Sequence, residues 1–417
     1  MQANLGESIM KLKILKFLII FIILTSLIMP VFGEEDMRKD PTCPLTKEEI
    51  QKRIDLTPPT NPEVLNQLKK DESILAIYGE IPERKGEDAY DWWISIDNIA
   101  YSIAVDGAFE KYHYDNGGTV IGFGPSCDGY IQITIYDELQ NEVSSQDITE
   151  MKEIVEKYAA KKEIKNIPVV FRSSEMGQTS SSIENEHENA EKNILAAAPN
   201  YYSDKIRPII GGISVYSSYT GPGTIGYVVK QTNNSSKRGF VTSAHLVDFQ
   251  NISVYQPTVG ILNGVGTSSV NATNKKVDAI YISPSTLHPF SVSAKIHTGN
   301  NQLVDVRGQL NPISGDFLKR SGLNTTSTSG YFIEYNYNYS LRDEQSGAVT
   351  FTLDKVGVMN GTTSQKKDSG GPIYIEGEGK VYIIGITQGH YGNLTIFVPC
   401  SEITSKLGVE ALKMEDN

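Results

Sequence analysis

The 417-residue sequence predicts two folded regions of different class: an α+β region in residues 34–171 and an all-β region in residues 208–417. Three observations predict this division. The length exceeds that of one ordinary domain. Residues 34–207 carry 34 acidic and 19 basic side chains, whereas residues 208–417 carry 15 and 16. The first region mixes helix caps with β-branched runs, and the second has short β-branched runs between Gly, Asn, Ser and Pro.

The first 33 residues have the pattern of a secretory signal peptide. Three lysines precede the apolar run FLIIFIILTSLIMPVFG, and Val31 and Gly33 stand at the −3 and −1 positions of a cut before Glu34. A retained anchor is the alternative, because the run approaches the length that spans a bilayer. Pro30 and the acidic stretch that follows favour the signal. We therefore expect a secreted protein, held at the cell surface only if this segment is retained.

Residues 34–171 combine helix caps with β-branched runs, which is typical of an α+β unit. The expected helix starts are the capping box of Thr46 with Glu49, the pair Asn61-Pro62, and Asp147 with Glu150. The expected strands are residues 94–105, 118–123, 130–136 and 167–171. No catalytic constellation is found here. Cys43 and Cys127 both lie in this region, and export would allow them to pair.

Residues 172–207 are expected to form a flexible linker, because their first part is rich in Ser, Glu and Asn and poor in apolar residues. The remainder, residues 208–417, has short strand-like runs at the spacing of a β-sandwich or β-barrel. Only the tail at residues 401–412 has a helical pattern, and Cys400 is the sole cysteine of this half.

Three motifs in the all-β half carry chemically useful residues. GFVTSAH ends in His245, KVDAIY contains Asp278, and KDSGGP contains Ser369. A serine hydroxyl needs an adjacent base, histidine is such a base near neutral pH, and a buried aspartate fixes its tautomer. Glycines after the serine let the backbone approach a substrate, and backbone N–H groups there can bind an oxyanion. Each motif alone is also compatible with an ordinary strand end, cap or turn.

Together the motifs resemble a known family. TSAH and DSGGP resemble the T-A-A/G-H and G-D-S-G-G-P motifs of the chymotrypsin-like serine proteases, most closely the streptogrisin and α-lytic type. Residues 318–330, residues 385–393 and the FVP before Cys400 also resemble segments of that group. The resemblance covers about residues 209–412. It implies two six-stranded antiparallel β-barrels, a C-terminal helix and an N-terminal pro-region.

The resemblance also implies roles for individual residues. His245 would be the general base, Asp278 its orienting partner and Ser369 the nucleophile. The N–H groups of Lys367 and Ser369 would form the oxyanion hole, and Arg320 would pair with Asp368 to hold the serine loop. The implied substrate-binding residues are Lys366, Thr387, Gln388, Gly389 and His390. Maturation would separate residues 34–171 from the protease at a bond between Glu191 and Ile210.

Three positions depart from the family pattern. Lys367 stands where the family has glycine, Gln388 where it has a serine that bonds the catalytic aspartate, and His390 where a glycine lines the groove. If the loop needs a backbone conformation that only glycine tolerates, Lys367 costs about 1–2 kcal/mol. Lys366, Lys367 and His390 would make the groove positive and favour an acidic residue before the scissile bond. The alternative is that the lysines face solvent.

The net charge of −12 argues against nucleic-acid binding. No metal or organic cofactor is expected. The partners expected are protein or peptide substrates and the chain's own pro-region, with the enzyme a monomer. The leading interpretation is a secreted serine endopeptidase made as a zymogen. The alternatives are an inactive homologue that acts as a binding or adhesion module, and a β-sandwich surface protein with chance motifs.

Overall fold

The computed structural model describes residues 47–179, 201–217, 220–247, 252–268, 276–284, 289–299, 302–342, 349–361 and 363–416. The expected signal peptide, Cys43 and residues 180–200 of the expected linker lie outside the described residues. Among the residues described, no helix combines the length and the apolar character that crossing a bilayer requires.

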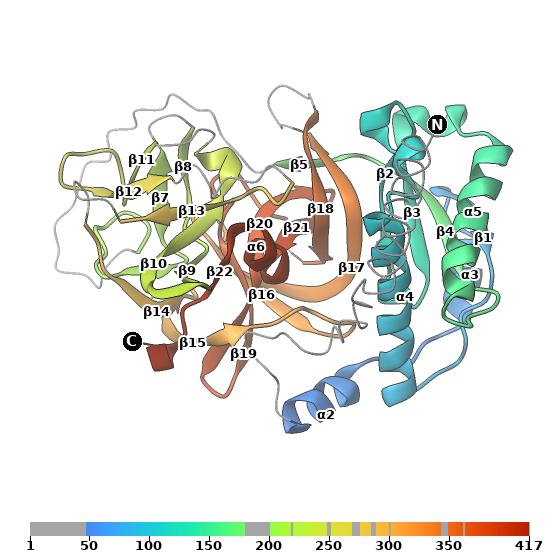
Figure 1. The fold of residues 1–417 in the computed structure, drawn as a ribbon, viewed down its shortest axis with the longest axis horizontal. Coiled ribbons are helices and arrows are strands. Elements are labelled where there is room, and N and C mark those ends of the chain that lie inside the picture. Colours follow the sequence, from blue (N-terminus) through green and yellow to red (C-terminus); the bar gives the residue numbers. More distant parts are fainter. Residues whose placement is uncertain are drawn as a thin grey trace, which may run out of the picture. The chain divides into compact units, whose positions relative to one another are not determined.

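Residues 47–179, here called the N-terminal layer, contain four α-helices and five strands (Figure 1). The helices are α2 (Lys47–Leu56), α3 (Glu63–Leu68), α4 (Glu87–Val105) and α5 (Ser145–Ala160). The strands are β1 (Ile74–Tyr78), β2 (Val120–Pro125), β3 (Ile131–Tyr136), β4 (Val169–Ser174) and β5 (Gly177–Thr179). Strands β4 and β5 thus occupy part of the range that the sequence suggested as linker.

The described residues from 201 to 416, here called the C-terminal half, are largely β structure in curled, mostly antiparallel sheets with one α-helix. Its first strands are β6 (Ile209–Gly211), β7 (Ser214–Ser217), β8 (Gly221–Thr224), β9 (Tyr227–Gln231), β10 (Asn234–Ser243), β11 (Ser253–Tyr255), β12 (Gly264–Ser268) and β13 (Ala279–Ser283). The later elements are β14 (Val292–His297), β15 (Leu303–Gln309), β16 (Phe317–Gly322), β17 (Thr326–Arg342), β18 (Val349–Met359), β19 (Pro372–Gly377), β20 (Lys380–Tyr391), β21 (Leu394–Pro399), helix α6 (Cys400–Leu407) and β22 (Val409–Ala411).

Helix α4 corrects one expectation, because the sequence suggested a strand at residues 94–105. Ile96, Ile99, Ala100 and Ile103 are all buried. Their spacing of three and four residues places them on one face of a helix, which buries that face against the sheet. The β-branched composition was therefore misleading, and the 3.6-residue period was the correct signal.

Helix α5 also begins earlier than expected. Ser144 is its N-cap: the Ser144 hydroxyl accepts from the Asp147 N–H at 3.0 Å, and the Asp147 carboxylate accepts from the Ser144 N–H at 3.0 Å. Asp147 is thus the third residue of a capping box rather than the cap itself. Met151 and Val155 on the buried face are fully enclosed.

The strands form two sheets. The smaller has the order β22-β9-β10-β13-β12-β11-β7-β8. The larger follows β1-β4-β3-β2-β17-β16-β19-β20-β15-β14-β6, with β5, β18 and β21 paired off this path. The strands of the N-terminal layer therefore continue the larger sheet of the C-terminal half, through the antiparallel pairing of Phe123 on β2 with Tyr337 on β17.

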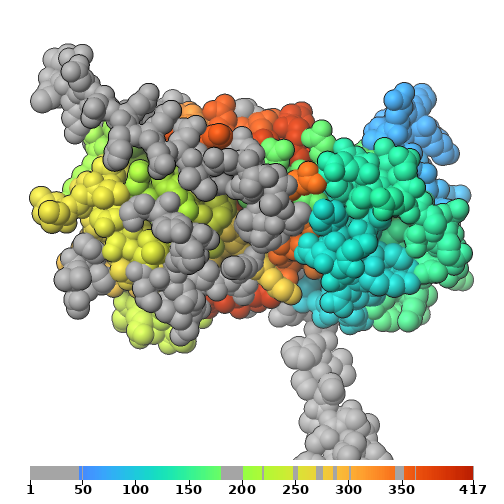
Figure 2. Space-filling model, turned by 90° about the horizontal axis from the view of Figure 1, so that it is seen from above, coloured from blue at the N-terminus to red at the C-terminus, as the bar shows by residue number. Residues whose placement is uncertain are grey.

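Helix α4 covers β17 at this junction. The Trp93 ring lies 6.1 Å from the Phe332 ring and 5.9 Å from the Tyr335 ring, measured between centroids, and Trp93 is 2% exposed. Such aromatic pairs add about 0.5–1.5 kcal/mol each beyond the area that they bury. Figure 2 shows most of the N-terminal layer, coloured blue to green, gathered on one side of the molecule.

Candidate active site

Two adjacent strands of the smaller sheet bring His245 and Asp278 together. Strand β10 pairs antiparallel with β13, and Ser243 at the end of β10 lies opposite Ala279 at the start of β13. His245 follows β10 and Asp278 precedes β13. In an antiparallel pair, the end of one strand lies beside the start of its partner. His245 and Asp278 are therefore neighbours, although they are far apart in the sequence.

The Asp278 carboxylate holds both the ring and the backbone of His245. Oδ2 of Asp278 lies 2.5 Å from Nδ1 of His245, and Oδ1 accepts the His245 backbone N–H at 2.8 Å. Asp278 is 2% exposed. A carboxylate only accepts hydrogen bonds, so Nδ1 carries the proton and Nε2 presents the lone pair that a base needs. This geometry fixes the imidazole tautomer and orientation.

Ser369 lies in a tight turn before β19. The Gly371 N–H donates to the Asp368 carbonyl oxygen at 3.0 Å, and the Gly370 N–H donates to the Thr387 carbonyl oxygen at 2.8 Å. Gly370 has φ of +84°, and a Cβ there would lie 2.1 Å from the Thr242 hydroxyl oxygen. Only glycine fits this position. Ser369 is fully buried, and its hydroxyl donates to the Gln388 carbonyl oxygen at 3.2 Å.

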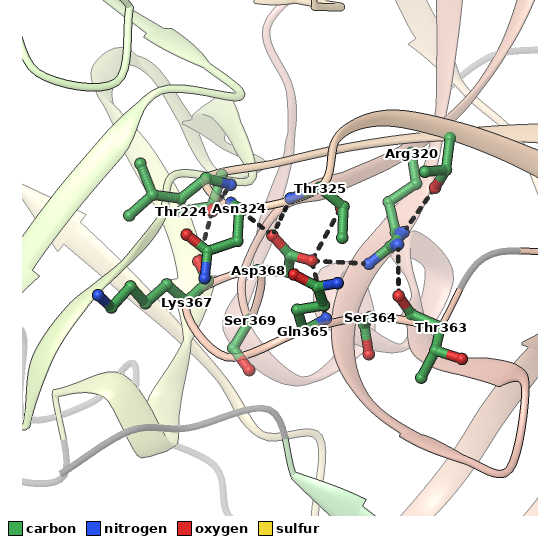
Figure 3. A network of polar contacts seen from close by, with 12 residues as sticks. Thr224, Arg320, Asn324, Thr325, Thr363, Ser364, Gln365, Lys367, Asp368 and Ser369 are labelled. Atoms are coloured by element: carbon green, nitrogen blue, oxygen red, sulfur yellow. Dashed lines mark hydrogen bonds and ion pairs between the residues drawn. The ribbon is translucent and has the colours of Figure 1, made fainter. Parts of the chain in front are cut away.

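Asp368 anchors the serine turn through a dense set of hydrogen bonds (Figure 3). Nη1 of Arg320 lies 3.2 Å from Oδ2 of Asp368, and both side chains are fully buried. This ion pair is expected from the sequence. The Asp368 carboxylate also accepts four further hydrogen bonds, from the N–H groups of Asn324, Thr325 and Gln365 and from the Thr325 hydroxyl, at 2.8–3.1 Å. A buried ion pair is stable only when its hydrogen-bonding capacity is met, and here the carboxylate is saturated.

Lys367 adopts a left-handed backbone conformation that favours glycine, with φ of +76°. The Lys367 carbonyl oxygen accepts from the Thr224 hydroxyl at 2.9 Å, which holds the peptide in this orientation. Within the described part of the chain, the backbone N–H groups of Lys367 and Ser369 donate no hydrogen bond. Two N–H groups of one turn are thus available for an acceptor, as an oxyanion hole requires.

Gln388 differs from the role that the alignment with a serine suggested. Its Nε2 donates to the backbone carbonyl oxygen of Asp278 at 3.2 Å, not to the carboxylate. Its Oε1 accepts from the Ser243 hydroxyl at 3.0 Å. Ser243 and Gln388 are both fully buried and connect β10 to β20. The sequence analysis missed Ser243, although it lies two residues before His245.

The remaining expected groove residues divide between the interior and the edge of β20. Thr387 is fully buried, and its carbonyl oxygen accepts from the Gly370 N–H and from the Ser243 hydroxyl. Lys366 is exposed, and its carbonyl oxygen accepts from the Asn324 side chain at 2.8 Å. Gly389 and His390 form the edge at which β20 meets β5.

Strand β5 of the N-terminal layer occupies that edge. Thr179 pairs antiparallel with Gly389, and Gln178 pairs with His390. On its other side β5 pairs with β17 at Leu341. A Cβ on Gly389 would lie 1.8 Å from the Gln178 carbonyl oxygen, so only glycine permits this approach. Figure 1 shows β5 extending from the N-terminal layer to the strands of the C-terminal half.

Comparison with models of protein families finds no match, and comparison with curated proteins finds none either. Three similar solved structures are Thermobifida fusca Protease A (23% identity, TM-score 0.39), Cellulomonas bogoriensis chymotrypsin (20%, 0.38) and Nocardiopsis protease (20%, 0.39). Each match covers 49% of this chain and 98%, 98% and 99% of those structures. These neighbours are chymotrypsin-like serine proteases.

Proposed function

We propose that this chain is the precursor of a secreted serine endopeptidase that uses Ser369, His245 and Asp278. One observation carries the proposal: the buried Asp278 carboxylate holds His245 through Nδ1 at 2.5 Å and through the backbone N–H at 2.8 Å. An ordinary strand-end histidine has no need of a double anchor on a buried carboxylate, whereas a general base does.

The chemistry follows from these positions. The Ser369 oxygen attacks the carbonyl carbon of the scissile peptide, and its proton passes to Nε2 of His245. The Asp278 carboxylate stabilises the imidazolium, and the N–H groups of Lys367 and Ser369 bind the oxyanion. The imidazolium then protonates the leaving amine, which breaks the peptide bond. A water molecule, deprotonated by His245, hydrolyses the acyl-enzyme and releases Ser369.

The Ser369 hydroxyl has to turn before this reaction can start. Its single proton is directed to the Gln388 carbonyl oxygen, and transfer to His245 requires that this hydrogen bond be broken. A catalytic group held in a non-productive contact is what a precursor needs. We therefore interpret the described state as the resting form of the enzyme.

The N-terminal layer is proposed to be an inhibitory pro-region. A peptide that adds to a sheet edge gains backbone hydrogen bonds along its length, and a protease groove offers its substrate such an edge. Strand β5 takes the edge at Gly389 and His390, so no substrate can add there until β5 leaves. Separation of the two halves by proteolysis would then activate the enzyme. We further propose that the two sheets correspond to the two six-stranded barrels of this protease type.

Labelling with a fluorophosphonate probe tests the reaction. We expect the matured protein to be labelled and its Ser369→Ala variant to remain unlabelled. A matched Ser236→Ala variant, which removes an exposed hydroxyl on β10, should be labelled as fully as the parent. A folded, processed protein that takes up no label would contradict the proposal and favour the inactive binding module.

The groove is proposed to prefer an acidic residue before the scissile bond. Lys366 is exposed beside the serine turn, and His390 is half-buried at the substrate edge, so positive charge can face a carboxylate. A panel of peptides that differ only at this position would measure the preference through kcat/KM. Cleavage restricted to peptides with large apolar or basic residues there would exclude it.

A further inference from the structure

Residues 201–208, here called the arm, lie against the C-terminal half immediately before β6. The buried side chain of Gln256 holds three groups of the arm: its Nε2 donates to the Asp204 carbonyl oxygen at 2.9 Å, and its Oε1 accepts from the Ile206 N–H at 2.9 Å and from the Arg207 guanidinium at 2.6 Å. Gln256 is fully buried. Both ends of one amide are thus used to bind the arm.

Two tyrosines of the arm cover His297 at the end of β14. The Tyr201 ring is stacked on the imidazole with 4.4 Å between centroids, and the Tyr202 ring meets it edge-on at 5.2 Å. His297 is 1% exposed. Removal of the arm would therefore uncover an imidazole and an amide that are otherwise enclosed.

The arm also reaches the turn that anchors the serine loop. The Tyr202 hydroxyl donates to the Thr326 carbonyl oxygen at 3.3 Å. Thr326 directly follows Asn324 and Thr325, whose N–H groups bind the Asp368 carboxylate. The arm thus contacts the same β16–β17 turn that positions the loop of Ser369.

We propose that maturation cuts the chain on the amino-terminal side of Tyr201, and that the mature protein keeps the arm seated on Gln256 and His297. The inference rests on the proposed function, since it concerns the processing of that precursor. The cut adds one water molecule across a peptide bond and leaves a new amino terminus ahead of the arm. The range expected from the sequence, Glu191 to Ile210, also includes bonds after the arm, and a cut at one of them would discard every contact described above.

N-terminal sequencing and intact mass of the matured protein test the inference. We expect a first residue at or before Tyr201, and a mature chain that starts between residues 202 and 210 would overturn it. To separate this result from the catalytic proposal, the Ser369→Ala precursor is cut with a small amount of added broad-specificity protease. Its large fragment should also start at or before Tyr201, and loss of the arm in that fragment would overturn the inference even if the parent enzyme is active.

Trypsin cleavage after Lys205 measures whether the arm is seated. The next N–H, that of Ile206, is bound by Gln256, so the bond should resist trypsin in the Ser369→Ala precursor. Gln256→Leu should speed cleavage at this bond about tenfold, the effect of removing hydrogen bonds to one amide. Gln231→Leu on β9 is the matched control and should leave the rate unchanged.

A second variant tests the inference independently in case Gln256→Leu fails to fold. Tyr201→Ala leaves Gln256 intact and removes only the ring stacked on His297, and it should speed the same cleavage by a smaller factor. Far-UV circular dichroism checks that each variant is folded. Equal cleavage rates in the parent, Gln256→Leu and Tyr201→Ala proteins would show that the arm is not seated and would overturn the inference.

Discussion

Two buried ion pairs of this protein are built very differently. The Arg320–Asp368 pair lies within the C-terminal half, and its carboxylate accepts four hydrogen bonds besides the arginine. The Lys355–Asp97 pair joins the C-terminal half to the N-terminal layer, and its charged atoms are 3.6 Å apart, beyond normal hydrogen-bond length.

The second pair is supported mainly by aromatic rings. The Tyr337 hydroxyl donates to Asp97 at 2.8 Å, and the Lys355 ammonium lies 3.7 Å from the centre of the Tyr335 ring. Burial raises the pKa of Asp97, which means that its charged form is only partly compensated. The saturated pair therefore fits a permanent part of the structure, and the weaker pair fits a junction that separates in the proposed maturation.

The largest expected effect is that of breaking the saturated pair. Asp368→Ala in the Ser369→Ala background leaves the Arg320 guanidinium buried without a counter-charge, and it should lower the free energy of unfolding by about 3–5 kcal/mol. Chemical denaturation measures this loss. A loss below about 1 kcal/mol would contradict the distinction between the two pairs.

The second effect is a pH dependence of the folding stability, caused by a buried carboxyl group where β17 meets the N-terminal layer. Glu334 on β17 is 4% exposed, with the Asn336 amide at 2.8 Å and Gln132 of the N-terminal layer at 3.5 Å, and burial raises its pKa from 4.5 to about 7. Between these values the folded protein binds more protons than the unfolded chain, so its stability falls as pH rises from 4.5 to 7. The loss is on the order of 3 kcal/mol.

Glu334→Gln provides the control for this dependence. It removes the titrating group and should flatten the fall in melting temperature between pH 5 and pH 8, both measured in the Ser369→Ala background. Parallel curves for the parent and Glu334→Gln would show that Glu334 is not the group responsible.

The weaker pair should tolerate loss of its negative charge better than the saturated pair. Asp97→Asn keeps an acceptor for the Tyr337 hydroxyl, while Lys355 retains its contact with the Tyr335 ring. We expect a loss of about 1–2 kcal/mol in the same denaturation experiment. A loss of unfolding free energy equal to that of Asp368→Ala would contradict the difference between the two ion pairs.

The smallest effect concerns the strained turn itself. Lys367→Gly relieves the left-handed conformation of a residue with a Cβ, and it should raise the free energy of unfolding by about 1 kcal/mol. Lys366→Gly is the matched control, since it removes the same charge from the neighbouring position. If Lys366→Gly raises the free energy of unfolding by as much or more, the gain comes from loss of the lysine charge and not from relief of backbone strain.

The sequence predicted local chemistry better than long-range packing. His245, Asp278 and Ser369 each stand in a short motif, and Arg320 could be paired with Asp368 because both lie in segments that resemble one known family. The strand expected at residues 94–105 is wrong, because isoleucine composition outweighed its 3.6-residue spacing. No local sequence pattern predicts the contact of Asp97 with Lys355, because these residues are more than 250 positions apart. The role of Gln256 was missed for the same reason, since its partners, the Asp204 carbonyl oxygen, the Ile206 N–H and the Arg207 guanidinium, lie far from it in the sequence.

The pairing of β2 with β17 has a consequence for the maturation proposed above. While the N-terminal layer is in place, β17 near Tyr337 is an interior strand of a continuous sheet. Departure of that layer would turn it into an edge, with unpaired backbone groups next to the aromatic surface of Phe332 and Tyr335. Such an edge is a template for pairing with any extended chain, including a second copy of the enzyme. In the proposed precursor, the N-terminal layer would thus act on solubility as well as on activity, by shielding this edge until maturation.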